Sequence, residues 1–274
     1  MSEPMALLGV DFTSAPRKAK PITVAHGRLD GDTVHLLALE TIADWPGFEA
    51  LLARPGPWLA ALDFPFSLPR AALDALGWPH GHWAAVMDHL AHLSRADFRA
   101  ALDADRQSRP MGARYPHRAT DQAAASHSPM KLVNPPVGLM CFEGAPRLRA
   151  AGLSLPGMHA GAPDRVAVEA YPGLLARAVT RASYKSDERR RQNPDRAATR
   201  AAILAAVEAG QALPGVRLGV AEAQRQQLCT DGSGDLLDAA LALVQAAWCL
   251  QRKAANYGCP PGTDALEGWI ATTA

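Results

Sequence analysis

Acidic residues end or interrupt three apolar segments of the chain. Asp11 follows Leu7–Val10, Asp63 follows Leu59–Leu62, and Glu169 lies within an alternating apolar segment. Such segments are typical of buried strands, where a carboxylate without a partner costs free energy. Mg²⁺ or Mn²⁺ would be a suitable partner, since these hard cations bind carboxylates while keeping waters or substrate phosphates as further ligands. All three acids are candidate catalytic residues, and Asp11 and Asp63 are also candidate metal ligands.

Two further aspartates, Asp235 and Asp238, stand at the start of Asp235–Arg252, where apolar residues recur at steps of three and four. This pattern predicts a helix, and a spacing of three places both carboxylates on one helix face. They are therefore predicted to complete the catalytic and metal-binding set. The chemistry expected of four such aspartates is two-metal hydrolysis, in which Asp11 bridges the ions and a water attacks a phosphodiester in line.

Each acid also has a purely structural explanation. Acids in the first turn of a helix are favoured by capping and by the helix dipole. Asp11 could form a local Asx-turn, and Glu169 could pair with Arg165 or Lys185. It is the occurrence of all five acids at strand ends and at one helix start that favours a shared site.

A phosphodiesterase must also hold phosphates, and basic residues are available. The stretch 106–118 has four arginines and no acid, and its prolines and glycine oppose a regular helix, so we expect an exposed loop beside the acids. Basic residues that neutralise phosphates make nucleic-acid binding salt-dependent. The candidate substrate-binding residues are Arg109, Arg114, Arg118, Lys131 and Lys185.

Composition limits the other possibilities. The 274 residues are 48% hydrophobic with a formal net charge of +1, so a nucleic acid would have to be attracted by local basic patches and not by the charge of the whole chain. The four cysteines form no CxxC pair, and GxxxxGK[ST], strand-linked GxGxxG and GxSxG motifs are missing. No apolar run approaches membrane-spanning length, and Met1–Val10 lacks the features of a signal peptide. We therefore expect a cytoplasmic protein with no membrane association.

The elements that position the acids follow from the hydrophobic pattern. Alternating or continuous apolar runs predict strands, and the Asp-Gly step at residues 30–31 predicts a hairpin between the second and third of them. The expected strands are Met5–Val10, Ile22–Leu29, Thr33–Leu39, Trp58–Leu62 and Arg165–Ala170. Helical spacing or composition predicts helices around Phe48–Leu52, Trp83–Leu93, Phe98–Leu102, Asp195–Ala209 and Asp235–Arg252. Residues 70–163, rich in proline, glycine and histidine, are expected to be a largely helical insertion within a single domain spanning 1–274.

Five motifs together resemble domain-of-unknown-function family 429, a family of predicted nucleases of RNase H-like fold. They are Gly9-Val-Asp-Phe-Thr-Ser-Ala15, Asp63-Phe-Pro-Phe-Ser-Leu-Pro69, Glu169-Ala-Tyr-Pro172, Tyr184-Lys185 and Asp235-Leu-Leu-Asp238-Ala-Ala-Leu241. The resemblance implies an α/β fold with an RNase H-like mixed central sheet flanked by helices. In that pattern the first strand carries an acid, here Asp11, the fourth strand ends in one, Asp63, and the last helix begins with one, Asp235 or Asp238.

The resemblance and the acids together predict a metal-dependent nuclease or phosphodiesterase, a hydrolase that uses Mg²⁺ or Mn²⁺ and binds nucleic acid. Two alternatives remain open. One is a catalytically silent regulatory or binding protein on the same fold. The other is an actin- or sugar-kinase-like phosphotransferase, whose first strand also carries an acid, although Asp11 is followed by no glycine-rich phosphate loop.

Overall fold

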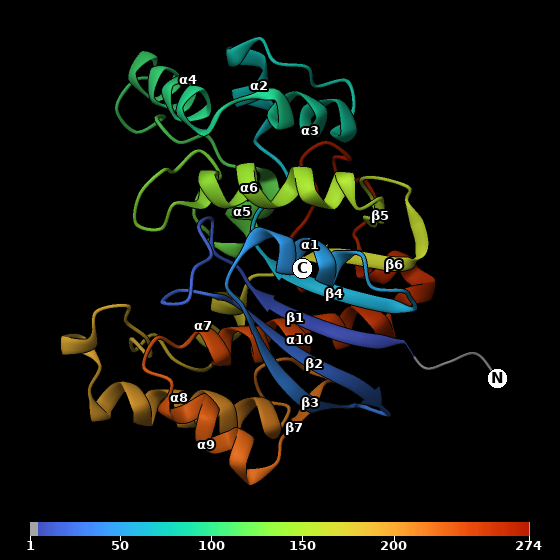
Figure 1. The fold of residues 1–274 in the computed structure, drawn as a ribbon, viewed down its shortest axis with the longest axis vertical. Helices are drawn as coiled ribbons and strands as arrows, with labels where there is room; N and C mark the ends of the chain where they lie inside the picture. The colour runs from blue at the N-terminus through green and yellow to red at the C-terminus, as the bar shows by residue number, and fades with distance from the viewer. Residues whose placement is uncertain (1–4, 274) are drawn as a thin grey trace.

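A seven-stranded mixed sheet forms the centre of the molecule (Figure 1). The computed structural model describes residues 5–273; part of the segment assessed for a signal peptide lies outside them. The strands are β1 (Ala6–Asp11), β2 (Ile22–Asp30), β3 (Thr33–Ile42), β4 (Trp58–Asp63), β5 (Leu153–Ser154), β6 (Ala162–Glu169) and β7 (Arg217–Gly219). Their order across the sheet is β5-β6-β4-β1-β2-β3-β7. The predicted α/β class with a mixed sheet is confirmed.

The first three strands form an antiparallel meander that includes the predicted hairpin. β1 pairs with β2, and β2 pairs with β3 through a hairpin whose connecting residues are Gly31 and Asp32. β4 then runs parallel to β1, and β6 runs parallel to β4. β1, β4 and β6 therefore end at the same edge of the sheet, and each of the three ends in an acid.

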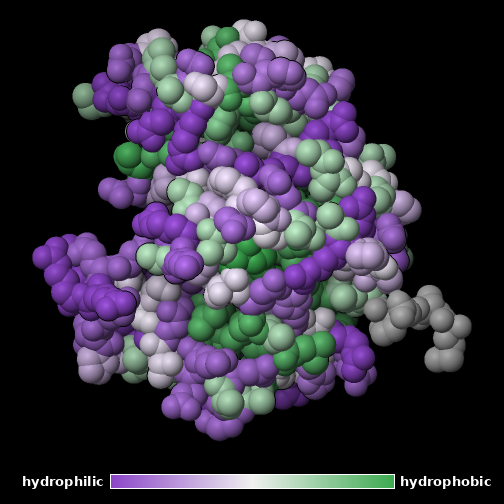
Figure 2. Space-filling view, viewed as in Figure 1, coloured by the Kyte–Doolittle hydropathy of each residue, from purple (hydrophilic) through white to green (hydrophobic). Residues whose placement is uncertain are grey.

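Helices cover both faces of the sheet (Figure 1). The helices are α1 (Trp45–Leu52), α2 (Arg70–Leu76), α3 (Trp83–His92), α4 (Arg95–Ser108), α5 (Ala119–Ala124), α6 (Val137–Ala150), α7 (Pro172–Val179), α8 (Pro194–Glu208), α9 (Glu222–Thr230) and α10 (Asp235–Gln251). Two 3₁₀ turns, η1 (Arg189–Arg191) and η2 (Lys253–Gly258), complete them. Hydrophilic side chains cover the corner where α8 projects at the lower left of the view (Figure 2). No helix within residues 5–273 is long and apolar enough to cross a membrane.

Two hydrophobic cores lie on the two faces, because successive side chains of a strand point in opposite directions. Leu8 and Val10 of β1 pack into the core formed with α1, α3, α4 and α6. Leu7 packs into the core formed with α7, α8, α9 and α10. Gly9 lies between Leu8 and Val10 and faces α10. A Cβ atom at this position would collide with the backbone of Ala239 and Leu243. A side chain at this position would push α10 away from the sheet, so this glycine is what lets the helix lie directly against β1.

The segment between β4 and β6 is largely helical: it contains α2 to α6, together with the two residues of β5 that extend the sheet. α2, α3, α4 and α6 stand together above the sheet in Figure 1. The predicted helices at Trp83–Leu93 and Phe98–Leu102 correspond to α3 and α4, but α4 extends to Ser108 and so includes Arg106. The predicted loop therefore begins only after Ser108. The hydrophobic pattern did not predict the helices α2, α5, α6, α7 and α9, nor the short strands β5 and β7.

Candidate functional site

Asp11 and Asp63 are neighbours because of strand register. In the parallel pairing of β1 with β4, the two aspartates are direct partners, each at the last position of its strand. Asp11 is 8% exposed, and Asp63 is partly buried. The apolar residues before each aspartate place the strands in the core, and the acid comes where each strand leaves it.

α10 brings the next two acids to the same edge. Its N-terminal flank Gly234 has a φ of 79°, a left-handed conformation that favours glycine, and Asp235 and Asp238 follow in the first turn. Asp238 is fully buried and Asp235 is 7% exposed. Since α10 lies against β1 at Gly9, its first turn is held beneath the ends of β1 and β4.

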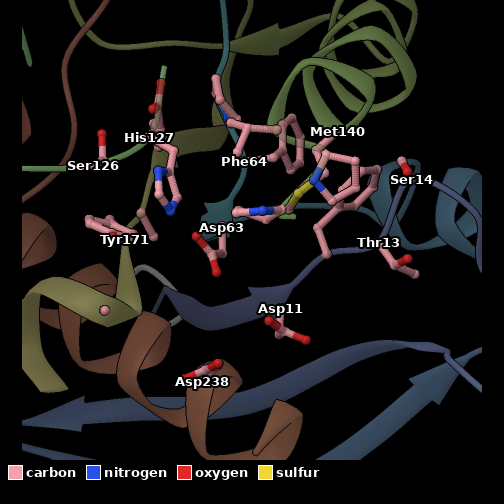
Figure 3. Close-up of a pocket in the computed structure, with 18 of the residues that line it drawn as sticks. Asp11, Thr13, Ser14, Asp63, Phe64, Ser126, His127, Met140, Tyr171 and Asp238 are labelled. Carbon is pink, nitrogen blue, oxygen red and sulfur yellow. The ribbon is translucent and has the colours of Figure 1, made fainter. Parts of the chain in front are cut away.

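These four aspartates line one cleft of about 460 Å³. Figure 3 shows Asp11, Asp63 and Asp238 on one side of it, with Phe64 and Met140 on the other. The opposite wall comes mostly from the segment between β4 and β6, which includes Pro135, Pro136, Val137 and Met140. The cleft therefore has a carboxylate floor and an apolar wall.

Two lysines lie among the floor carboxylates. The Lys185 ammonium donates to one oxygen of Asp238, and the Tyr184 hydroxyl donates to the other at 2.6 Å. The Lys20 ammonium lies 2.9 Å from both oxygens of Asp235. Asp235 and Asp238 are thus already paired with cations of the chain.

Within the part of the chain that the structure describes, Asp11 and Asp63 have no such close cation. Burial raises the pKa of Asp11 well above its ordinary value, and the neighbouring charges of Asp235 and Asp238 raise it further. Burial, followed by repulsion from Asp238, raises the pKa of Asp63 to about 7, although Lys185 acts in the opposite direction. Seven carboxylates line the cleft, but only three lysine or arginine side chains do so. The cleft has more negative charge than the chain compensates.

The donor set fits a hard divalent cation in chemistry, because carboxylate oxygens dominate it and charge remains uncompensated. Asp11 and Asp63 could hold such an ion directly, whereas Asp235 and Asp238 could do so only if their lysines move. Within residues 5–273, no group of three or more histidine, cysteine, aspartate or glutamate side chains is arranged to hold a metal ion. The metal-binding role of the four aspartates stays a prediction.

Glu169 belongs to a different cluster at the end of β6. Its carboxylate accepts two hydrogen bonds from the guanidinium of Arg118, at 2.6 and 2.8 Å, and one from the backbone of Phe66. Arg118 also donates twice to Asp121, at 2.7 and 3.1 Å. All three charged side chains are buried, and Arg118 is fully so. Of the structural alternatives, pairing with Arg165 or Lys185 is wrong, since the partner is Arg118.

The expectation that Arg118 lies on an exposed loop is also wrong. Its guanidinium is enclosed, and its five N–H groups donate to two carboxylates and to the backbone carbonyl of Glu267, so in this arrangement none is left for a substrate phosphate. Arg109 is ion-paired with Asp105 at 2.8 Å, while Arg114 is exposed. Neither of these two arginines nor Lys131 lines the cleft. Of the predicted substrate-binding residues, only Lys185 and the buried Arg118 are found there.

Sequence reasoning did not identify Lys20 or the hydroxyl of Tyr184 as members of the site. Lys20 lies 215 positions from its partner Asp235, and no local pattern connects the two. Tyr184 and Lys185 form one of the motifs quoted for the family resemblance, which was the one available signal for this side of the cleft.

The comparison with family models agrees with the resemblance. The model described as "Protein of unknown function (DUF429)" matches residues 9–263, so the chain belongs to this family. The matched range includes Asp11, Asp63, Asp235 and Asp238. No curated protein and no solved structure matches the chain.

Proposed function

We propose that this member of the DUF429 family is a metal-dependent nuclease of RNase H-like fold. One observation carries the proposal: acids from the ends of β1 and β4 and from the first turn of α10 line one cleft and outnumber its cations. A strand carrying Asp11, a parallel strand ending in Asp63 and a final long helix beginning with Asp235 agree with the acid pattern that the family resemblance implies.

The chain's residues divide the work in a definite way. Asp11 and Asp63, which lack close cations, would hold the metal together with Asp238 once Lys185 leaves it. Mg²⁺ or Mn²⁺ would act as a Lewis acid toward the phosphoryl group and lower the pKa of a water nucleophile. Lys185 and Lys20 would then be free to donate to the non-bridging oxygens of the scissile phosphate. The apolar wall offers no polar group to hold water on the side opposite the acids.

The test is cleavage of labelled DNA, RNA and RNA–DNA hybrid, and of bis(p-nitrophenyl) phosphate, in Mg²⁺, Mn²⁺ or EDTA. We expect hydrolysis that requires the metal and falls by at least about 100-fold in Asp11→Asn and Asp63→Asn, since ligand loss exceeds the 10- to 100-fold cost of losing an outer-shell partner. The matched control is Asp88→Asn, an exposed aspartate of α3 paired with Arg149 at 3.4 Å. Equal activity in Asp11→Asn and in the wild type would rule out this site as the source of cleavage.

A second candidate is a catalytically silent binding protein on the same fold. The observation favouring it is that Lys20 and Lys185 already neutralise Asp235 and Asp238. This candidate predicts binding of nucleotides or oligonucleotides without turnover under any metal condition. Titration calorimetry beside the cleavage assay separates the two.

A further inference from the structure

A second hollow, of about 650 Å³, adjoins the acid cleft. Its walls are formed by the second half of α7, the end of α5 and the residues that follow α7. Gly173, Tyr184 and Lys185 line both the hollow and the cleft. A ligand too long for the cleft could therefore continue directly into the hollow.

The charge of this hollow is opposite to that of the cleft. Arg177, Arg181 and Lys185 line it, and no carboxylate does. Arg177 donates to the Tyr171 hydroxyl at 2.7 Å and to the carbonyl of Ala124, both of which are neutral groups. Among the residues described by the structure, neither Arg177 nor Arg181 is ion-paired. Both are exposed, and no carboxylate of the described part of the chain compensates their positive charge.

Other arginines near the site differ in this respect. Arg190 and Arg191 of η1 both pair with Glu188, and Arg109 pairs with Asp105. A surface arginine held by a carboxylate must give up that partner before binding a phosphate. Arg177 and Arg181 are not ion-paired in the described structure, so they can bind a phosphate without first breaking an ion pair.

The cationic region continues along the rim of the cleft. His127, which lines the cleft, has a pKa lowered first by burial and then by the positive charges of Lys131, His117 and Arg177. These three residues are therefore close enough to act on it through space. Lys131, expected from the sequence to bind substrate, acts on His127 in this way but does not itself line the cleft.

We propose that the hollow lined by Arg177 and Arg181 binds a backbone phosphate adjoining the scissile one, and that the substrate is single-stranded nucleic acid. The proposal rests on the proposed nuclease function and specifies its substrate. The strand crosses the shared residues Tyr184 and Lys185, with the reacting phosphate over the aspartates and its neighbour over the arginines.

The cleft itself supports a single strand. Its volume of about 460 Å³ is in the range of sites that take small molecules. A base can enter such a space only when it is unstacked and unpaired. The half-buried side chains of Pro136, Val137 and Met140 line the cleft and give an apolar surface on which that base could lie. Aromatic and apolar side chains bind unstacked bases with little sequence preference.

The experiment measures binding of fluorescein-labelled oligothymidylate and oligouridylate, about eight nucleotides long to suit a small binding module. Fluorescence anisotropy is followed across a salt series in the Asp11→Asn background, which limits cleavage. The variants are Arg181→Gln and Arg181→Glu. The matched control is Arg28→Glu: this exposed arginine of β2 lies at the other end of the β1–β2 pairing from Asp11.

We expect Arg181→Glu to weaken oligonucleotide binding by about tenfold or more, and to lower the log–log salt slope by about 0.7 per lost phosphate contact. Arg181→Gln should have a smaller effect in the same direction, and Arg28→Glu should stay within about twofold of the parent. Thymidine and uridine monophosphate lack the adjoining phosphate, so the Arg181 variants should bind them as the parent does.

Three results would overturn the proposal: equal weakening by Arg181→Glu and Arg28→Glu, equal loss of mononucleotide and oligonucleotide binding, or tighter binding of a blunt duplex than of the single strand. The proposed nuclease function has a separate readout. Bis(p-nitrophenyl) phosphate has no adjoining phosphate, so its hydrolysis by the wild type tests the nuclease function apart from the subsite, and Arg28→Glu should hydrolyse it at the parent rate. If the wild type cleaves nothing, the nuclease proposal fails, while the effect of Arg181 on binding still tests the subsite.

Discussion

Two groups of buried acids lie at the same edge of the sheet, but they differ in how their charge is compensated. Glu169 and Asp121 share the guanidinium of Arg118, which donates two hydrogen bonds to each carboxylate. Asp11 and Asp63 sit on the neighbouring strands β1 and β4, and no cation among residues 5–273 bonds to them directly. The first group is complete without a ligand, and the second is not.

This difference separates a structural acid from a functional one. A buried carboxylate with an ideal bidentate partner contributes to positioning of the chain around it. A buried carboxylate whose pKa is raised by burial and by like charges costs stability, and such groups concentrate at functional sites. Burial raises the pKa of Glu169 as well, although Arg118 lowers it, so the direct ion pair is what separates the two groups. Glu169 joins the segment containing α5 to the sheet, whereas Asp11 and Asp63 are the acids that we propose hold a cation.

The largest expected effect is a loss of stability when the ion pairs of Arg118 with Glu169 and Asp121 are removed. Arg118→Met should lower the free energy of unfolding by roughly 3–5 kcal/mol, because it leaves two carboxylates buried without their partner. Urea unfolding measures it, and Arg114→Met at an exposed position should change stability by no more than about 0.5 kcal/mol. Equal stability of the two variants would contradict a structural role for Arg118.

Asp63→Asn should instead raise the free energy of unfolding. The folded-state pKa of Asp63, about 7, lies above its ordinary value of 3.8, so the folded chain holds this proton more tightly and loses stability as pH rises between the two values. The variant should therefore be more stable than the wild type at about pH 8, by roughly 2–4 kcal/mol given about 1.4 kcal/mol per pKa unit, and the gain should shrink toward pH 4. Urea unfolding across this range checks it; a destabilised variant at about pH 8 would refute the claim that Asp63 is uncompensated.

A metal should supply the missing charge. If Mn²⁺ binds only the folded state, a concentration 100 times its dissociation constant stabilises the chain by about 2.7 kcal/mol. Calorimetric unfolding of EDTA-treated protein should show this gain in the wild type and in Asp88→Asn, and lose most of it in Asp11→Asn at the same concentration. A gain of equal size in Asp11→Asn would place the metal elsewhere.

The aspartates of the cleft could be predicted from the sequence because the patterns that indicate them lie in short stretches of the chain. Asp11 and Asp63 each follow a run of apolar residues, and Asp235 and Asp238 share a helical spacing. The order of β1 to β4 and the long helix α10 followed from the same periodicities. Parallel pairing of neighbouring strands then brings their ends together without further information.

The compensated group could not be predicted in this way. Arg118 is 51 positions from Glu169, and its surroundings contain the prolines and glycine that indicated an exposed loop. The strands β5 and β7 have only two and three residues, too few to show an alternating pattern. α6 contains Gly144 and Pro146, residues that oppose a helix locally, although tertiary packing of Leu139, Cys141 and Leu148 stabilises one here.

The smallest expected effect on stability comes from Asp231, an acid that caps the start of α10. Two glycines, Gly232 and Gly234, would make the turn before α10 flexible, but Asp231 organises this turn. One of its oxygens accepts from the backbone and hydroxyl of Ser233, at 3.0 and 2.6 Å, and the other accepts from the backbone of Leu236 at 3.0 Å. These bonds satisfy an N–H group that the first turn of a helix leaves without a partner.

Asp231→Ala should cost about 1 kcal/mol of stability, and Asp231→Asn clearly less, since an amide oxygen can still accept. The stabilisation by Mn²⁺ should persist in both variants. α10 is held in place along its length by packing against β1, β2 and β4, and by its close approach at Gly9, so loss of a cap frays the turn without moving the helix. Calorimetry with and without Mn²⁺ measures both quantities. If Asp231→Ala instead abolished the metal response, the position of Asp235 and Asp238 would depend on the turn before the helix more than on the packing behind it.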